Sequence, residues 1–497
     1  MELFDLVVIG GGIHGCGVAA DAAGRGLKVA LFEKADLGAG TSSASTKLIH
    51  GGLRYLESYE FSLVRQCLME QRLLLQNAGY LVQPLPFVIP VDNNTRPLWM
   101  INLGLFFYDR LTARSMPHST ILSAQDLEKL ELQKKPKAAF RYYDCQTDDN
   151  RLVIADALLA TSLGAKIYTH HEVTSVVSTE ESWIVKTQGK FGPYFVKAKA
   201  IANMTGPWLK NVTQDCQLIT SQTEVKLVQG AHLIVPKLYS GPDALAYQHD
   251  DGRLVFFVPY LEKFTLVGTT EFVIDKMPQK PTIDPCELTY LKDLVSKVFG
   301  KNIKDNDIIG HYAGVRALID SNKSASKATR DYKVEKMYCP HHKHPIVHLI
   351  GGKITTWRLS AEDIVSSLKK EFPLMTAPWT TKKILPGARV NTSSHMIFEE
   401  LCRDFPFINK ELLKRWSQTY GLRTYNLIGL RSSLKEFGAK IADNLYEAEI
   451  DFLMSTEWAQ NLDDILFRRT KLGLTLSPPE VKLIYDWFGQ PITHQIS

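Results

Sequence analysis

Three glycines near the start of the chain have the spacing of a nucleotide-binding loop. Gly10, Gly12 and Gly15 form a G-x-G-x-x-G pattern directly after an apolar run at 3–9. In such a loop the first glycine permits a tight turn, the second lets the backbone approach a pyrophosphate, and the third lets a helix pack on the strand. Glu33 follows about 20 residues later, where a carboxylate can accept hydrogen bonds from ribose hydroxyls. This acidic residue disfavours NADP, and the early position of the loop in a long chain favours FAD.

A strand, a helix and a second strand must position this loop. The alanine-rich stretch 15–25 predicts the helix, and 29–32 predicts the second strand. Strand-like and helical patterns then alternate to about residue 370. From about 375 we expect helices only, near 396–404, 410–420, 440–455 and 463–471. This order predicts an α/β fold with an appended helical domain.

Composition limits the function classes. The 497 residues are 45% hydrophobic, which is enough for two or three domains, and the net charge of +5 is mild. Such a charge suits small anionic partners or a solvated surface, and gives no indication of nucleic acid. Seven scattered cysteines without a Cys-x-x-Cys pair argue against a disulfide framework or a zinc site. No signal peptide and no membrane-spanning stretch are expected, so we predict a cytoplasmic protein that can still lie on a membrane surface.

Longer motifs are more specific than the glycine loop. The strings IGGGIHGCGVAADAAGRG at 9–26 and TSSASTKLIHGGLRYLE at 41–57 are followed by YDC (143–145), TGPW (205–208), GAHLIVP (230–236), GTT (268–270), GVR (314–316), TRDY (329–332) and GGKIT (351–355). With these motifs, and with YEAE and RRT in the tail, the chain resembles the aerobic, FAD-dependent glycerol-3-phosphate dehydrogenases over nearly its whole length. It departs from the usual family pattern at four positions: Gln229, Glu271, Ala317 and Trp357.

The resemblance implies a fold and domain ranges. The fold is a doubly wound, Rossmann-like FAD-binding domain of the glycine/D-amino-acid-oxidase type, with an antiparallel-sheet substrate domain and a C-terminal helical domain. The expected ranges are 1–75, 150–215 and 305–372 for the FAD domain, 76–149 and 216–304 for the substrate cap, and 375–497 for the helical domain.

The resemblance also implies a reaction. The flavoprotein oxidises sn-glycerol 3-phosphate to dihydroxyacetone phosphate, with hydride transfer to flavin N5, and passes the electrons to a membrane quinone. It rests on the inner face of the cytoplasmic membrane, and a homodimer is left open. Two segments can supply an apolar membrane face: 355–370, an amphipathic helix, and 98–111, rich in aromatic residues and flanked by Arg96 and Arg110.

A phosphorylated polyol needs a phosphate clamp and a base. By resemblance, the residues around the phosphate and the flavin edge are Arg54, Tyr55, Arg316, Arg330 and Lys353, although each basic residue can instead form a structural ion pair. Either His232 or His50 can act as the base, because histidine titrates near neutral pH. Water, or an alkoxide polarised by an arginine such as Arg316, is a third route.

The remaining cofactor residues lie in loops. Gly351, Gly352 and Lys353 are expected to open a helix whose N–H groups stabilise negative charge on the reduced flavin. Further predicted cofactor-binding residues are Ser42, Ser45, Thr46, Lys47, Gly206 and Thr355. The histidines at 341, 342 and 344 lack a carboxylate or cysteine at ligand spacing, so a hydrophilic loop is favoured there over a metal site.

Three other functions are weighed against this one. An amine or amino-acid oxidase on the same fold would use one carboxylate-binding arginine and an apolar pocket. A glycerophosphate oxidase would use oxygen as the acceptor. A flavin-containing binding protein would show no turnover, and the basic, tyrosine and histidine residues in the motifs argue against it.

Overall fold

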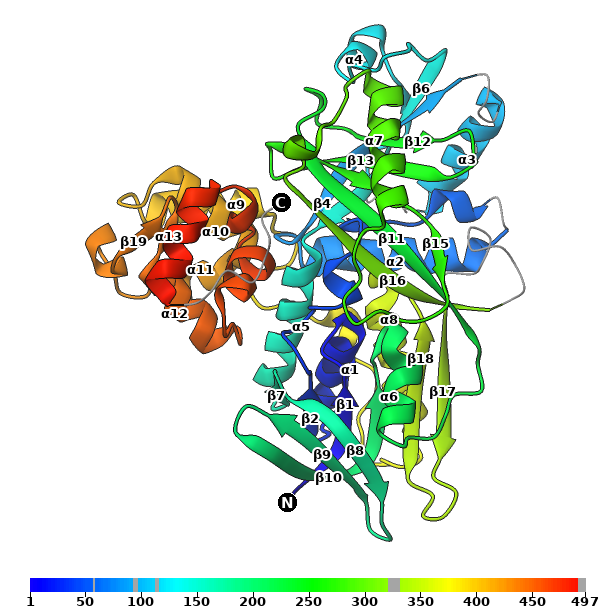
Figure 1. The fold of residues 1–497 in the computed structure, drawn as a ribbon, viewed down its shortest axis with the longest axis vertical. Helices are drawn as coiled ribbons and strands as arrows, with labels where there is room; N and C mark the ends of the chain where they lie inside the picture. Colours follow the sequence, from blue (N-terminus) through cyan, green and yellow to red (C-terminus); the bar gives the residue numbers. More distant parts are fainter. Residues whose placement is uncertain (57–58, 93–96, 112–115, 321–330, 490–497) are drawn as a thin grey trace.

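Two β-sheets and a lobe of helices make up the protein in the computed structural model, which describes residues 1–56, 59–92, 97–111, 116–320 and 331–489. The first sheet lies at the bottom of Figure 1, the second sheet lies above it, and the C-terminal lobe lies beside them. This architecture confirms the predicted α/β fold class.

The first sheet holds the glycine loop. Its strand order is β17-β18-β10-β1-β2-β7, with β8 and β9 extending it from β10. β1 pairs in parallel with both β2 and β10, and its apolar side chains are buried on both faces. The strands are β1 (Glu2–Ile9), β2 (Val29–Phe32), β7 (Lys166–Tyr168), β8 (Glu172–Ser178), β9 (Trp183–Gly189), β10 (Gly192–Asn203), β17 (Tyr332–Tyr338) and β18 (Pro345–Gly351).

Three helices cover this sheet. α1 (Ile13–Gly24) packs against both α5 (Asp149–Ser162) and α8 (Trp357–Ser367). The approach to α8 is close, because a Cβ added to Gly17 would lie 2.8 Å from Trp357 Cδ1. The short helix α6 (Leu209–Asp215) follows β10.

The second sheet is mostly antiparallel and has ten strands. One face packs on α7 (Pro285–Phe299), and the other packs on α2 (Phe61–Asn77) and α3 (Leu98–Leu111). The strands are β3 (Leu48–Ile49), β4 (Val82–Val91), β5 (Thr120–Ile121), β6 (Ala138–Thr147), β11 (Val225–Pro236), β12 (Ala244–Gln248), β13 (Leu254–Tyr260), β14 (Phe264–Gly268), β15 (Phe272–Ile274) and β16 (Gly310–Ile319), with α4 (Ala124–Glu128) beside them.

The sheets place one segment differently from the predicted domain ranges. β16 falls in the range 305–372 expected for the FAD domain, yet it pairs with β11 from Ile319–Val225 to Gly310–Ile234. It therefore belongs to the second sheet, because pairing along its full length satisfies its backbone hydrogen bonds there. The domain boundaries themselves stay a prediction.

The C-terminal lobe contains α9 (Ser394–Asp404), α10 (Lys410–Tyr420), α11 (Thr424–Ile428), α12 (Glu447–Thr456) and α13 (Pro478–Phe488). Ser393 and Asn409 cap the first two helices through backbone N–H groups. The helix expected at 440–455 begins only at Glu447, because Asn444 adopts φ 58° in a turn between β19 (Lys440–Ala442) and β20 (Leu445–Tyr446), so the expectation of helices only is wrong at 440–446. The helix expected at 463–471 is a π-helix over Asp464–Arg469.

One of the two segments considered for membrane contact is buried in the structure. In α8, Trp357, Ala361, Ile364 and Val365 are buried against the first sheet. The expectation that this helix offers an apolar membrane face is therefore wrong, since its apolar side forms core. Among the described residues, no helix is both long enough and apolar enough to cross a bilayer.

Candidate active site

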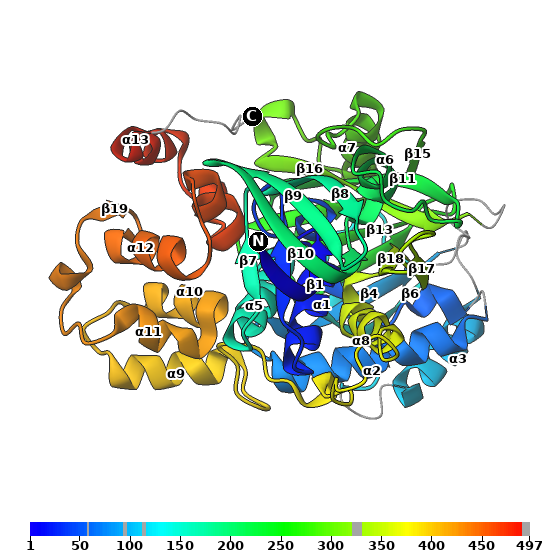
Figure 2. The ribbon, with the colours of Figure 1, turned by 90° about the horizontal axis from the view of Figure 1, so that it is seen from below.

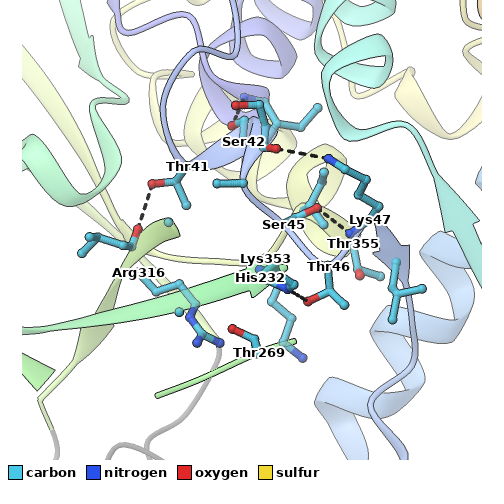
Figure 3. Close-up of a pocket in the computed structure, with 18 of the residues that line it drawn as sticks. Thr41, Ser42, Ser45, Thr46, Lys47, His232, Thr269, Arg316, Lys353 and Thr355 are labelled. Carbon is cyan, nitrogen blue, oxygen red and sulfur yellow. Dashed lines mark hydrogen bonds between the residues drawn. The ribbon is translucent and has the colours of Figure 1, made fainter. Parts of the chain in front are cut away.

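A cavity of about 2460 Å³ lies between the two sheets and the C-terminal lobe. It is lined by the glycine loop, the 39–56 segment, β11, β16, the turn after β18 and part of the C-terminal lobe. Figure 3 shows how side chains from these distant segments meet in one space. Drug-sized ligands occupy about 300–1,000 Å³, so this cavity can hold a large cofactor together with a substrate.

The glycine loop has the geometry of a pyrophosphate site. Gly10 has φ 105°, and a Cβ there would lie 2.8 Å from the carbonyl oxygen of Met204. A Cβ on Gly15 would lie 1.9 Å from the carbonyl oxygen of Gly10, so only glycine lets α1 pack this close to β1. Gly12 caps α1 without a side chain, and the Ile13 N–H donates to Ser42 Oγ at 3.0 Å. This leaves the positive end of α1 facing the cavity, as a bound pyrophosphate requires.

Glu33 lies at the edge of the cavity with its carboxylate held by two backbone donors. The Gly11 N–H donates to Oε2 at 2.7 Å, and the Ala35 N–H donates to Oε1 at 2.9 Å. Burial raises the pKa of Glu33, while these two N–H groups lower it. The carboxylate is thus fixed in place, with oxygen lone pairs left for a ribose.

The loop that carries Ser45, Thr46 and Lys47 is held by a residue that the sequence motifs did not single out. Asp149 accepts hydrogen bonds from Ser45 Oγ at 2.8 Å and from Lys47 Nζ at 2.8 Å. Lys47 therefore lines the cavity as one half of a buried ion pair. The consecutive acids at 148–149 just before an apolar helical stretch are an N-terminal helix signal that could have identified Asp149.

His232 is buried beside this loop. Its Nε2 hydrogen-bonds Thr46 Oγ1 at 2.9 Å, and its ring stacks on Tyr312 at 4.9 Å between centroids. Its Nδ1 is buried and has no hydrogen-bond partner among the described residues. Burial, Lys47 and Arg316 together lower the pKa of His232 to about 3. The imidazole is therefore neutral at pH 7.

The second candidate base, His50, lines the same cavity next to a buried carboxylate. Asp144 Oδ1 accepts hydrogen bonds from the Gly51 N–H at 3.1 Å, from Gln71 Nε2 at 2.8 Å and from Tyr108 Oη at 2.7 Å. These donors belong to three elements, namely the His50 loop, α2 and α3. Asp144, the middle residue of the YDC motif, thus fixes the backbone beside His50.

Burial raises the pKa of Asp144 to about 6, although its three donors lower it. Because the folded-state pKa lies above the ordinary value of 3.8, its contribution to stability is complete below about pH 4 and is lost as the pH rises through 6. An Asp144→Asn variant can accept the same hydrogen bonds without a charge. We expect it to exceed the wild type in unfolding free energy by up to about 3 kcal/mol at pH 8, with the difference shrinking toward pH 4.

Thermal melts of the FAD-loaded protein across this pH range measure the effect. The Asp126→Asn variant is the control: its carboxyl has a lowered pKa, so its contribution to stability changes only below about pH 4 and the variant should differ from the wild type by a nearly constant amount between pH 4 and 8. A gain for Asp144→Asn that does not depend on pH would contradict the buried-charge explanation.

Three of the predicted basic residues line the cavity. Arg54 Nη2 donates to the carbonyl oxygen of Gly252, and Arg316 Nη2 donates to that of Thr270, both at 3.4 Å. Lys353 Nζ lies 3.8 Å from the centre of the Tyr55 ring. Both guanidinium groups therefore lie at the wall of the cavity, where positive charge attracts an anion. Arg330 lies outside the described residues.

The turn after β18 also lines the cavity. Gly351 and Gly352 adopt φ 76° and φ 94°, and Thr355 follows them in a short turn that leads into α8. Gly206, with φ 57°, faces the cavity from the turn after β10. Among the described residues, no group of three or more His, Cys, Asp and Glu side chains could hold a metal ion.

Comparison with known proteins places this cavity in a class. The model of the FAD-dependent oxidoreductase family matches residues 5–356, and that of the C-terminal domain of alpha-glycerophosphate oxidase matches residues 379–480. The fold and the glycine-lined cavity therefore define an FAD-dependent oxidoreductase, as the sequence predicts.

Comparison with full-length relatives identifies the family within this class. The chain is 41% identical to glycerol-3-phosphate dehydrogenase of Pseudomonas aeruginosa, over 96% of this chain and 94% of the relative. It is 37% identical to the aerobic glycerol-3-phosphate dehydrogenase of Escherichia coli, over 100% and 99%, and 39% identical to D-erythritol 1-phosphate dehydrogenase of Brucella abortus, over 98% of each. The chain belongs to the family of aerobic, FAD-dependent glycerol-3-phosphate dehydrogenases, which confirms the predicted resemblance.

The fold agrees with a solved structure. The glycerol-3-phosphate dehydrogenase of Bacillus halodurans, complexed with FAD, superposes with a TM-score of 0.77 at 22% identity, over 98% of this chain and 89% of that one. This similarity supports the architecture of two sheets with an appended helical lobe.

Proposed function

We propose that this protein oxidises sn-glycerol 3-phosphate to dihydroxyacetone phosphate and passes the electrons to a membrane quinone. The observation that carries the proposal is the cavity itself, in which Arg54, Arg316 and Lys353 line the same space as the glycine loop. Relatives of 37–41% identity act, by their names, on phosphorylated polyols. Several basic residues suit a phosphate dianion better than the single carboxylate of an amino acid.

Each part of the site has a distinct task in this proposal. FAD, when bound, supplies the hydride acceptor. Arg54, Arg316, Tyr55 and Lys353 bind and orient the phosphate, and Arg330 is proposed to join them. Either His232 or His50 accepts the hydroxyl proton, and the N–H groups of Gly351, Gly352 and Lys353 would stabilise negative charge on the reduced cofactor.

The pH dependence of kcat/KM distinguishes the two candidate bases. His232 is neutral above about pH 4, because its pKa lies near 3. If His232 is the base, kcat/KM should stay level between pH 5 and 7 apart from ionisation of the substrate. Ionisation of a protein group in that range would instead point to another base, and loss of that acidic limb in His50→Asn but not in Asp144→Asn, whose carboxyl has a pKa of about 6 in the wild type, would identify His50.

The acceptor is tested by reoxidation of the reduced enzyme. After anaerobic reduction with glycerol 3-phosphate, the protein is mixed either with an oxygen-free solution of a short-chain quinone or with aerated buffer. Much faster reoxidation by the quinone supports the proposal. Equal or faster reoxidation by oxygen would favour a glycerophosphate oxidase.

Helix α3 is the surface we propose for membrane contact. Trp99, Phe106 and Phe107 are 65%, 48% and 49% exposed, although all three are large and aromatic. The guanidinium of Arg110 lies 4.3 Å from the centre of the Phe106 ring. α3 lies at the periphery in both ribbon views, away from the C-terminal lobe (Figure 2). Exposed apolar side chains beside cations are typical of proteins that lie on an anionic bilayer.

α3 connects this surface to the site, because several of its exposed residues also line the cavity. Met100, Ile101, Leu103 and Leu111 line the cavity, together with Phe61 at the start of α2. A lipid-soluble acceptor that enters beside α3 would meet an apolar wall leading toward the cofactor. This continuity supports a quinone acceptor together with peripheral binding to the inner face of the cytoplasmic membrane.

A Phe106→Ser variant tests the surface, because Phe106 is exposed and lies outside the cavity lining, whereas Trp99 and Phe107 also line the cavity. Large apolar side chains contribute about 1.5–3 kcal/mol each when buried, so we expect partition onto anionic vesicles to fall at least about tenfold. Co-sedimentation with vesicles at low and high salt measures it, and turnover with a soluble dye acceptor should stay near wild type. Leu430→Ser, at a fully exposed apolar residue of the C-terminal lobe, is the control. Equal loss in the control would place the contact elsewhere.

A further inference from the structure

The C-terminal lobe reaches the cofactor cavity through one short segment. Phe467, Arg468 and Lys471 line the cavity, although they belong to the C-terminal lobe, which lies beside the first sheet (Figure 1). The segment is the π-helix Asp464–Arg469 followed by Lys471, which has the left-handed φ of 61°. We call 464–471 the lobe segment. π-helical turns occur frequently at functional sites.

The first contact of the lobe segment is with the loop that follows Glu33. Asp36 accepts a hydrogen bond from Arg468 Nε at 2.6 Å. It accepts two more from Arg469, from Nη1 and Nη2, both at 2.7 Å. Asp36 and Arg469 are almost completely buried. Burial alone would raise the pKa of Asp36, but Arg469 and Arg468 lower it below its ordinary value.

The second contact is with Asp148 at the start of α5, next to the residue that holds the loop of Ser45 to Lys47. Lys471 Nζ lies 3.2 Å from Asp148 Oδ1 and donates to the carbonyl oxygen of Arg468 at 3.0 Å. Asp148 directly precedes Asp149, which holds Ser45 and Lys47. Burial lowers the pKa of Lys471, Asp148 raises it, and the nearby charge of Lys47 lowers it further. Two buried lysines thus face two adjacent carboxylates at the start of α5.

We propose that the lobe segment is part of the FAD-binding site, because it fixes both cofactor-binding loops from outside the FAD-binding domain. Arg468 and Lys471 act as positioning residues through Asp36 and Asp148. The proposal relies on the assignment of the Glu33 and Ser45–Lys47 loops to FAD, and it does not depend on the substrate or on the quinone. It gives the helical domain a role in cofactor retention.

Reciprocal coupling follows from this arrangement. If docking of the lobe segment favours FAD binding, FAD must stabilise docking of the lobe segment by the same free energy. Both directions can be measured without turnover.

The first experiment measures FAD affinity by flavin fluorescence on protein from which the cofactor has been removed. Each lost charge-assisted contact corresponds to about 1.5–3 kcal/mol, so Arg468→Met and Lys471→Met should each raise the Kd for FAD at least about tenfold. Arg468→Lys and Lys471→Arg should recover much of that loss, because they restore the charge.

A matched control separates this role from general stability. Arg415 forms a buried ion pair with Glu449 inside the same lobe, with Nη2–Oε2 at 2.5 Å, and is absent from the cavity lining. Arg415→Met should lower the melting temperature and leave the Kd for FAD within about threefold of wild type. Equal weakening by Arg415→Met, or unchanged affinity in folded Arg468→Met and Lys471→Met, would overturn the proposal.

Hydrogen exchange on the wild-type chain tests the reverse direction and needs no variant. Addition of FAD to the cofactor-free protein should slow exchange in 464–471 more than in α9 and α10. No change in 464–471, or the same change throughout the lobe, would contradict the coupling even if the variants fail to fold.

Discussion

Replacing Arg316 by alanine should lower kcat/KM for glycerol 3-phosphate by about 10- to 150-fold, since one charged hydrogen bond contributes about 1.5–3 kcal/mol. The structure supports a contact with the substrate because Arg316 lines the cavity, where its Nη2 donates to the carbonyl oxygen of Thr270. Arg54→Ala should have a similar effect for the same reason. Steady-state kinetics with a dye acceptor measures both.

Activity with unphosphorylated glycerol distinguishes loss of phosphate binding from structural damage in these two variants. It carries no phosphate, so its already low kcat/KM should change far less than that of glycerol 3-phosphate. Arg389→Ala removes an arginine that forms a salt bridge with Glu400 in the C-terminal lobe. This change should leave kcat/KM for both substrates unaffected. Equal losses for the two substrates would show that Arg316 and Arg54 support the fold and do not bind phosphate.

Replacing Glu33 by alanine should weaken FAD binding by about 10- to 150-fold, which corresponds to about 1.5–3 kcal/mol. The variant loses the ribose acceptor and also leaves the Gly11 and Ala35 N–H groups without their carboxylate. Flavin fluorescence during titration of cofactor-free protein gives the Kd directly.

The FAD affinity of two further variants is compared with that of Glu33→Ala. Glu33→Gln keeps one acceptor oxygen and should lie between the wild type and Glu33→Ala. Glu181→Ala removes a carboxylate that is 79% exposed on the same sheet, and it should bind FAD normally. Unchanged affinity in Glu33→Ala would remove this residue from the cofactor site.

The glycine loop and its flanking strands could be predicted from sequence because each feature has a local cause. Gly10 needs a positive φ, and Gly15 must lack a Cβ that would meet the Gly10 carbonyl oxygen. Arg54, His232, Arg316 and Lys353 could be named from the motifs that carry the family resemblance. The structure places all four around one cavity. Their roles stay a prediction.

The features that sequence reasoning missed depend on contacts between distant segments. Asp144 and Asp149 become informative only when the fold brings their donors together from other elements. The apolar side of α8 has the same periodicity whether it faces a membrane or the core, so packing alone decides between them. The hairpin β19–β20 follows from a left-handed Asn444, for which helical periodicity gives no signal.

Flavin reduction under anaerobic conditions is the direct test of whether this protein oxidises glycerol 3-phosphate. The FAD-loaded protein is mixed in turn with glycerol 3-phosphate, erythritol phosphate, glycerol and D-alanine, and the flavin absorbance is followed. We predict rapid bleaching by glycerol 3-phosphate, together with formation of dihydroxyacetone phosphate, and little or no bleaching by glycerol or D-alanine. Faster bleaching by erythritol phosphate would indicate that the substrate is a longer polyol phosphate. Bleaching by D-alanine, with none by either phosphate, would contradict the account.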